Sequence, residues 1–479
     1  MIRPLLLVII AAVVSACSQP LERQIVADAA SALGGKSRIL AVKTIVIEGE
    51  GTNGNLGQDM TMDAASQQFV VSGYKRAVDV VNLRARTEQT RTPNFAYFQG
   101  PQPQKQVLGI DGDIGYNVAP NGNATRVSNA VAKDRRVEIY HHPIKIVRAA
   151  LDPETKLTSP RTAGREQVVD ITTANGLMFT LAIDATTKLP TWVVSMTDNT
   201  NLGDVLIETA FDDYQDEGGL KLPKHFTTKT DKYKTAELRV TKQTIDGDTG
   251  DLTAPPAAAS APAIAAPAPA TVTAEELAKG IWFLGGQSHH SVLVEFADHL
   301  TLIEAPQNDT RTLAVIAKAK SLRPEKPLTQ VINTHHHFDH SGGIRAAVAE
   351  GLTVITHKAN AAFYQDAAAR PHTIVPDALA KAPKPLKLTP VDEELELKDG
   401  TMTVNVYHVA GNPHADTMLM AHFPREKILV EVDAFSPGSA VQPYAANLKE
   451  NISRRGLKVD RVVPLHGTIV PYGELLKIP

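Results

Sequence analysis

The sequence predicts two globular domains: an N-terminal antiparallel β domain with a helix, and a C-terminal α/β domain. A chain of 479 residues with 43% hydrophobic residues is too long for one ordinary core and apolar enough for two. Residues 252–273 are nearly all Ala and Pro, so we expect a semi-rigid linker between domains at 17–251 and 274–479. Three of the 16 histidines precede this linker, which assigns metal chemistry to the second domain.

The N-terminus has the pattern of a bacterial lipoprotein signal peptide over residues 1–16. Arg3 precedes an apolar run from Leu5 to Val14, which is too short to cross a hydrocarbon core of roughly 30 Å as a helix. The run ends in Val14-Ser15-Ala16-Cys17, which resembles the lipobox, in which the cysteine carries the lipid. This resemblance implies a protein anchored at Cys17, and Ser18 favours the outer membrane, facing the periplasm. An ordinary signal peptide with an incidental cysteine is the alternative.

Residues 17–251 have the rhythm of an antiparallel meander. A helix is predicted from Leu21 to Leu33, stopped by Gly34-Gly35. In residues 177–184, Phe179, Leu181 and Ile183 alternate with Met178, Thr180 and Ala182, as in a strand with one buried face. Further strands are predicted at Thr44–Glu50, Val81–Thr87, Val205–Phe211 and Glu237–Thr241.

The succession of FTLAIDATTKLP, a strand, a turn and FDDYQDEGGLKLPKHF resembles the curved half-barrel of lipoprotein-carrier proteins. This resemblance implies a concavity covered by helices that binds a lipid ligand. It rests on strand rhythm and turn residues, so a domain that serves only as a spacer or docking surface is the alternative.

The second domain contains THHHFDHSGG at residues 334–343. PLTQVINTH, which ends at His335, reads as a short buried strand, and residues two apart on a strand point to the same side. His335 and His337 can therefore bind one cation together, while His336 points away. Asp339 and His340 lie where the chain turns towards a helix, from which they can reach a second cation.

His-x-His-x-Asp-His resembles the signature of the metallo-β-lactamase fold superfamily at all four specified positions. The resemblance implies an αββα sandwich and three further ligands, each just after an apolar strand. These are His414 for the first metal, Asp433 as the bridge and His466 for the second metal. The implied metal ligands are thus His335, His337, Asp339, His340, His414, Asp433 and His466.

The remaining histidines of this domain are expected to be ordinary buried or surface residues, with two retained as pocket residues. The ordinary set is His289, His299, His372, His408 and His422, and the retained pair is His290 and His357. Glu304-Ala305-Pro306 replaces the family's usual Asp-x-Gly, which leaves open how that rim of the site is braced.

The ligand types predict a hydrolase that uses metal-bound hydroxide, because the chain has a single cysteine and no Gly-x-Ser-x-Gly nucleophile motif. Two Zn²⁺ ions are expected, with Fe or Mn as alternatives, and Asp339 is expected to orient the hydroxide. The substrate is expected to be a small ester, thioester, lactone or amide; Asp433, where the best-known lactamases have cysteine, disfavours antibiotic hydrolysis. A net charge of −3 argues against nucleic acid as a partner. The alternative is a lipid- or lipoprotein-handling envelope protein with a structural or vestigial metal site.

Overall fold

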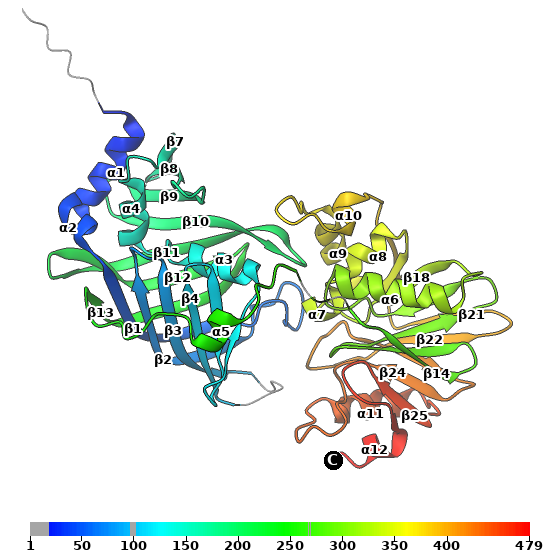
Figure 1. Cartoon of the computed structure of the whole chain (residues 1–479). Coiled ribbons are helices and arrows are strands. Elements are labelled where there is room, and N and C mark those ends of the chain that lie inside the picture. The colour runs from blue at the N-terminus through cyan, green and yellow to red at the C-terminus, as the bar shows by residue number, and fades with distance from the viewer. Residues whose placement is uncertain (1–18, 96–101, 267, 269) are drawn as a thin grey trace, which may run out of the picture.

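The computed structural model describes residues 19–95, 102–266, 268 and 270–479. The signal peptide predicted at residues 1–16 and the lipid attachment predicted at Cys17 lie outside these ranges. Two domains lie side by side, one built on a single large sheet and the other on two smaller sheets (Figure 1). Among the described residues, no helix has the length and apolar character needed to span a membrane.

The N-terminal domain is one curved antiparallel sheet, as the sequence predicts. Over residues 44–245, the described part of the chain contributes 13 strands, and each pairs antiparallel with its neighbours. Their order across the sheet is β6 (Ala124–Arg126), β5 (Ile114–Val118), β4 (Gln104–Asp111), β3 (Arg84–Pro93), β2 (Gln68–Asp79), β1 (Thr44–Gly54), β13 (Tyr233–Ile245), β12 (Leu220–Thr230), β11 (Gly203–Glu217), β10 (Pro190–Asn199), β9 (Met178–Asp184), β8 (Glu166–Thr172) and β7 (Lys156–Ala163).

Helices cover parts of this sheet and close its core. The predicted first helix is α1 (Leu21–Ala32), which buries Ile25, Val26 and Ala29 and ends just before Gly34. Gly34 is required there, because its φ is +123° and a Cβ would lie 2.2 Å from the carbonyl oxygen of Gly219. The domain also contains α2 (Lys36–Ala41), α3 (Asn129–Glu138) and α4 (Pro143–Ala150).

The predicted strand at Val81–Thr87 is wrong at its start. The chain turns between β2 and β3, because the Asp79 carboxylate accepts hydrogen bonds from the backbone N–H groups of Val81 and Asn82. Leu83 completes the turn with a φ of +55°. The buried face predicted for residues 177–184 is observed, since Phe179, Leu181 and Ile183 are buried, but the alternation is incomplete because Ala182 on the opposite face is buried as well.

The Ala/Pro segment is less free than its composition predicts. Its first half packs on β5 and β6, where it forms α5 (Pro256–Ser260) and buries Ala254 and Ala258. The backbone N–H of Ala254 donates to the Asp111 carboxylate at 3.0 Å. Small side chains allow this close packing, so residues 252–264 belong to the first domain's surface.

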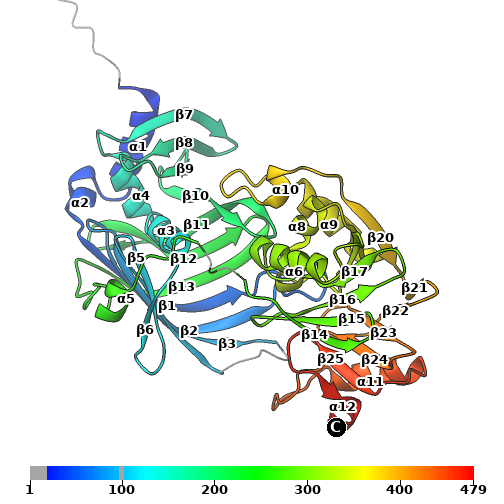
Figure 2. The ribbon, with the colours of Figure 1, turned by 45° about the vertical axis from the view of Figure 1, so that its right-hand side comes forward.

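The C-terminal domain is an αββα sandwich, which confirms the predicted fold class (Figure 2). The first of its two sheets contains β14 (Thr273–Ala278), β15 (Ile281–Gly285), β16 (Ser291–Glu295), β17 (Leu300–Ile303), β18 (Leu328–Ile332), β19 (Thr353–His357) and β20 (Lys387–Val391). The second contains β21 (Glu394–Lys398), β22 (Thr403–His408), β23 (Leu419–Phe423), β24 (Ile428–Glu431), β25 (Arg461–Pro464) and β26 (Val470–Pro471).

Each sheet is covered by helices on its outer face. On the first sheet lie α6 (Asp309–Leu322), α8 (Ile344–Ala349), α9 (Ala361–Ala369) and α10 (Ala378–Lys381), and on the second α11 (Ala445–Arg454) and α12 (Tyr472–Leu476). Two short helical turns, α7 (Phe338–Ser341) and η1 (Lys358–Asn360), precede α8 and α9. In β16, Val292 and Val294 join the core between the sheets, whereas Leu293 joins the core beneath the helices. Strands buried on both faces explain the continuous apolar runs in this half of the sequence.

Candidate metal centre

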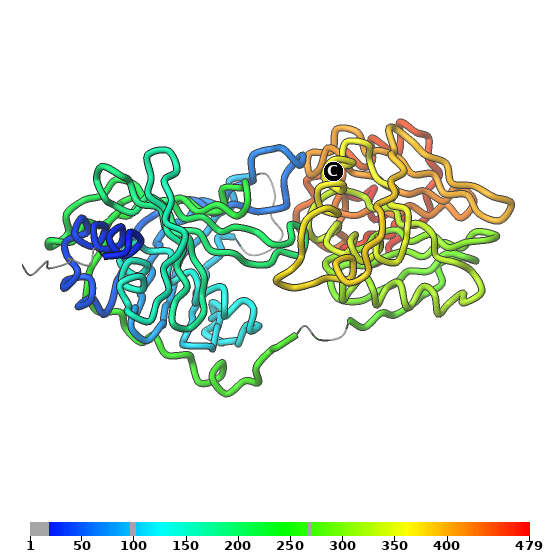
Figure 3. Tube along the Cα trace, turned by 90° about the horizontal axis from the view of Figure 1, so that it is seen from above, coloured from blue at the N-terminus to red at the C-terminus, as the bar shows by residue number. Residues whose placement is uncertain are grey.

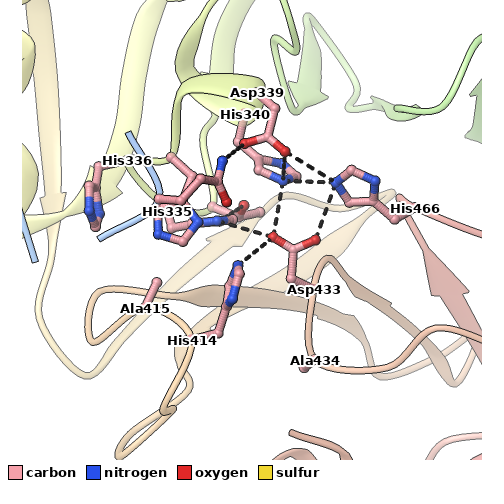
Figure 4. A network of polar contacts seen from close by, with 12 residues as sticks. His335, His336, Asp339, His340, His414, Ala415, Asp433, Ala434 and His466 are labelled. Atoms are coloured by element: carbon pink, nitrogen blue, oxygen red, sulfur yellow. Dashed lines mark hydrogen bonds and ion pairs between the residues drawn. The ribbon is translucent and has the colours of Figure 1, made fainter. Parts of the chain in front are cut away.

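The structure brings all seven predicted ligands to one edge of the sandwich. His335 and His337 lie in the loop after β18, while Asp339 and His340 lie in α7. His414, Asp433 and His466 follow β22, β24 and β25 of the other sheet. Loops at strand ends from both sheets therefore meet at a single point, where the side chains converge (Figure 4).

The first group of donors consists of His335, His337, His414 and Asp433. Their four ligand atoms all lie within 4.8 Å of one another. Asp433 Oδ2 is 2.9 Å from His414 Nε2 and 3.2 Å from His335 Nε2. Within the described part of the chain, His337 Nδ1 is buried without a hydrogen-bond partner, and so is His335 Nε2, because its contact with Asp433 Oδ2 lacks hydrogen-bond geometry. Because unpaired buried nitrogens cost free energy, these lone pairs fit a site that holds a cation.

The second group consists of Asp339, His340, His466 and His289, again with ligand atoms within 4.8 Å of one another. Asp433 lies between the two groups. Its Oδ1 is 3.2 Å from His466 Nε2, and its Oδ2 is 3.1 Å from His340 Nε2. The carboxylate of Asp433 therefore contacts histidines of both groups.

His289 is a site residue that the sequence reasoning missed. It lies between β15 and β16, and its Nε2 is 3.1 Å from Asp339 Oδ2. Its position next to a strand end of the same sheet was the available signal. The two histidines retained as pocket residues lie outside both groups: the His290 ring is 4.8 Å from that of Phe283, and the His357 ring is 4.5 Å from that of His408.

Glu304, which stands where the family has its Asp-x-Gly segment, supports this side of the site by hydrogen bonds to Thr334 and His340. It is fully buried with a φ of +74°, and its Oε1 accepts the backbone N–H of Thr334 at 2.7 Å. Its Oε2 accepts from His340 Nδ1 at 2.8 Å. A carboxylate can only accept here, so Nδ1 carries a proton, and in its neutral form His340 directs the lone pair of Nε2 at the donor groups.

The electrostatics of the site favour cations. Burial lowers the pKa of His335 to about 3 and that of His466 to about 4, so both imidazoles are neutral ligands at pH 7. Burial alone would raise the pKa of Asp433, but the imidazoles of His340, His466 and His414 hold it well below its usual range. Burial alone would lower the pKa of His340, but Asp433 and Asp339 raise it well above its ordinary value. A positive charge between these carboxylates is therefore strongly stabilised.

Comparison with known proteins identifies the class of the second domain. Residues 284–466 match the model of the metallo-beta-lactamase superfamily, so the C-terminal domain has the metallo-β-lactamase fold. No curated protein matches the chain significantly.

Similar solved structures include three metallo-β-lactamases. The enzyme from Pontibacter korlensis is 18% identical over 43% of this chain and 96% of its own, with a TM-score of 0.34. The enzyme from Hirschia baltica is 17% identical over 43% and 94%, with a TM-score of 0.34. FIM-1 from Pseudomonas aeruginosa, in a mono-zinc form, is 17% identical over 43% and 92%, with a TM-score of 0.34.

Proposed function

We propose that the chain is a dinuclear metal-dependent hydrolase of esters, thioesters, lactones or amides. The observation that carries the proposal is the pair of adjoining donor groups that share Asp433. The first ion would be held by His335, His337 and His414, and the second by Asp339, His340 and His466, with His289 beside the second.

Zinc suits imidazole and carboxylate ligands, with iron or manganese as alternatives, and such ions would activate water and polarise the substrate carbonyl. The protein's own groups prepare the site for this chemistry. Glu304 aims the Nε2 lone pair of His340, and Asp433 stabilises charge between the two groups. Asp339 lies at the more exposed side of the second group, where its carboxylate would orient an attacking water. We therefore assign Asp339 the catalytic role.

The test compares the intact chain with Asp339→Ala. The wild-type protein is expected to contain two equivalents of metal and to hydrolyse members of a panel of esters, thioesters, lactones and lactams. The variant is expected to remain folded and lose turnover. Asp298→Ala is the matched control, because its side chain is 87% exposed at the opposite end of β16 from His289. A wild-type protein that purifies without metal and is inert on the whole panel would overturn the proposal.

A second function, binding of an apolar ligand by the N-terminal domain, is supported by a cavity of about 490 Å³ between the sheet and α3. Leu108, Leu238 and Val131 are among its lining residues, and ligand sites of this size are common. Leu108→Trp should weaken binding of a fluorescent long-chain fatty acid, whereas Leu206→Trp, on the exposed surface of β11, should not. Equal binding of the fatty acid by both variants would refute the proposal that a lipid binds in this cavity.

We also propose that the protein is anchored to the outer membrane through a lipid on Cys17 and faces the periplasm. The lipobox-like sequence supports this location. Cys17→Ser should move the protein from the membrane fraction to the soluble fraction, and continued membrane partition would sink the assignment.

A further inference from the structure

The loop between β1 and β2, residues 55–67, reaches from the N-terminal domain to the C-terminal domain (Figure 3); we call it the docking loop. Its backbone pairs directly with the second domain. The carbonyl of Gly57 accepts the N–H of Phe338 at 3.1 Å, and the carbonyl of Met60 accepts the N–H of Asp416 at 3.0 Å. Phe338 directly precedes the ligand Asp339, so the loop touches the segment that presents the metal ligands.

Gly57 allows this close approach. Its φ is +77°, and a Cβ at this position would lie 2.2 Å from the Phe338 ring. Both the backbone conformation and the packing therefore exclude a side chain. The loop cannot be moved or substituted here without withdrawing it from α7.

The carbonyl of Asp59 accepts two imidazole N–H groups, from Nε2 of His336 at 3.0 Å and from Nε2 of His337 at 2.9 Å. A carbonyl has no proton to give, so both Nε2 atoms must carry hydrogen. In a neutral imidazole the lone pair is then on Nδ1. Among the described residues, His337 Nδ1 is one of the two buried, unpartnered nitrogens of the first donor group, whereas His336 Nδ1 lies 3.3 Å from the Thr417 hydroxyl. The loop thus selects which nitrogen of His337 is free to bind a cation.

Gln58 acts on the second donor group. Its side-chain amide donates to Asp339 Oδ1 at 2.7 Å. The other oxygen, Oδ2, faces the donors of the second group, at 3.1 Å from His289 Nε2 and 3.7 Å from His340 Nε2. The amide therefore fixes one carboxylate oxygen and leaves the other directed at the site.

We propose that the docking loop is a built part of the metal centre, so that the N-terminal domain supplies the groups that orient His337 and Asp339. Gln58 and the backbone of Asp59 are positioning groups, because they act through the ligands. This inference rests on the proposed function, since it assigns the loop a role in binding the metals of that same site. It also gives the N-terminal domain a part in the chemistry beyond spacing or lipid binding.

The test uses the full chain with Gln58→Met, which keeps the length of the side chain and removes the donor, and Gly57→Ala, which withdraws the loop. Metal affinity is measured by competition with a chromophoric chelator, and ligand geometry by the visible spectrum of the cobalt form. Gln58→Met is expected to keep two equivalents at saturation but to bind the second about 10–100-fold more weakly, with an altered cobalt spectrum. Gly57→Ala is expected to weaken both sites. Asp63→Ala is the matched control on the same loop, because its carboxylate is 91% exposed.

Each outcome separates this inference from the proposed function. Wild-type protein that binds no metal refutes the proposed function. Wild-type protein that binds two equivalents, with both loop variants equal to it, refutes the inference alone. The unfolding midpoint of each metal-free variant is measured as well. A variant that binds metal more weakly but unfolds at the same midpoint as the wild-type protein supports the positioning role. Variants whose metal affinity falls only when their unfolding midpoint falls as well overturn it.

Discussion

Replacing Glu304 by Gln tests whether a buried carboxylate sets the tautomer of a metal ligand. The amide oxygen of Gln can still accept the backbone N–H of Thr334, so the loop that leads to His335 keeps its support. The amide nitrogen would then face His340 Nδ1–H, where two donors oppose each other. Either that hydrogen bond is lost, or His340 changes tautomer and points a proton at the second donor group.

The magnitude follows from the one contact that is removed. A hydrogen bond between an N–H and a charged acceptor contributes about 1.5–3 kcal/mol. At about 1.4 kcal/mol per factor of ten, the second metal should bind about 10–100-fold more weakly. The first metal should keep its affinity, because His335, His337 and His414 make no contact with the substituted oxygen.

The assay is a stepwise chelator competition that resolves the two metal-binding constants of Glu304→Gln and of the wild-type protein. Glu295→Gln is the matched control, because Glu295 forms ion pairs with Arg323 and Lys326 at the end of β16 that lies away from the metal centre. The reasoning is refuted if both constants of Glu304→Gln equal those of the wild-type protein, or if both fall by the same factor.

Three further predictions follow from the geometry and the pKa shifts. Asp433→Asn should weaken both metal sites, because its carboxylate touches donors of both groups; metal analysis after dialysis should find fewer than two equivalents, and full retention would contradict the bridging position. His289→Phe should weaken only the second site, since His289 contacts Asp339 Oδ2, and a change confined to the first site in chelator competition would argue against its placement. Burial lowers the pKa of His141 to about 3 and of His142 to about 4. Between about pH 6.5 and 4, these histidines are therefore protonated only in the unfolded chain, so the free energy of unfolding decreases as the pH is lowered. The midpoint temperature of unfolding of the metal-free protein should be lower at pH 5 than at pH 7, and His141→Gln should make this difference smaller. An identical pH dependence in the variant would count against burial of His141 as the cause.

The ligands named from the sequence share a feature that a sequence can carry. Each lies in the compact motif or just beyond an apolar strand, and strand ends converge at one edge of a sheet. His289 also follows a strand, but it lies outside the motif and next to His290, which belongs to neither donor group. A residue type alone could not separate His289 from His290.

Other parts of the site leave no such trace. The carbonyl of Asp59 acts through the backbone, so its side chain gives no indication of the contact. Gln58 lies 281 positions from Asp339, in a domain whose pattern predicts only strands and turns. The packing of the Ala/Pro segment was equally hidden, because small residues show no apolar period even where Ala254 and Ala258 are buried. Contacts between domains depend on tertiary placement, which local patterns do not encode.

The balance of buried charge at the centre favours the binding of cations. Nearby imidazoles hold the pKa of Asp339 and Asp433 below the usual range, so both carboxylates are ionised, while burial keeps His335 and His466 neutral. Burial raises the pKa of Glu431 well above its ordinary value, and its Oε2 accepts the backbone N–H groups of the two residues just after Asp433. Without metal, Asp433 and Asp339 favour the protonated form of His340, whose charge then compensates part of theirs. A dication carries more positive charge than a proton and can also accept the free lone pairs of the imidazole nitrogens. Metal binding would therefore compensate the charge of the two carboxylates and give the unpaired nitrogens a partner.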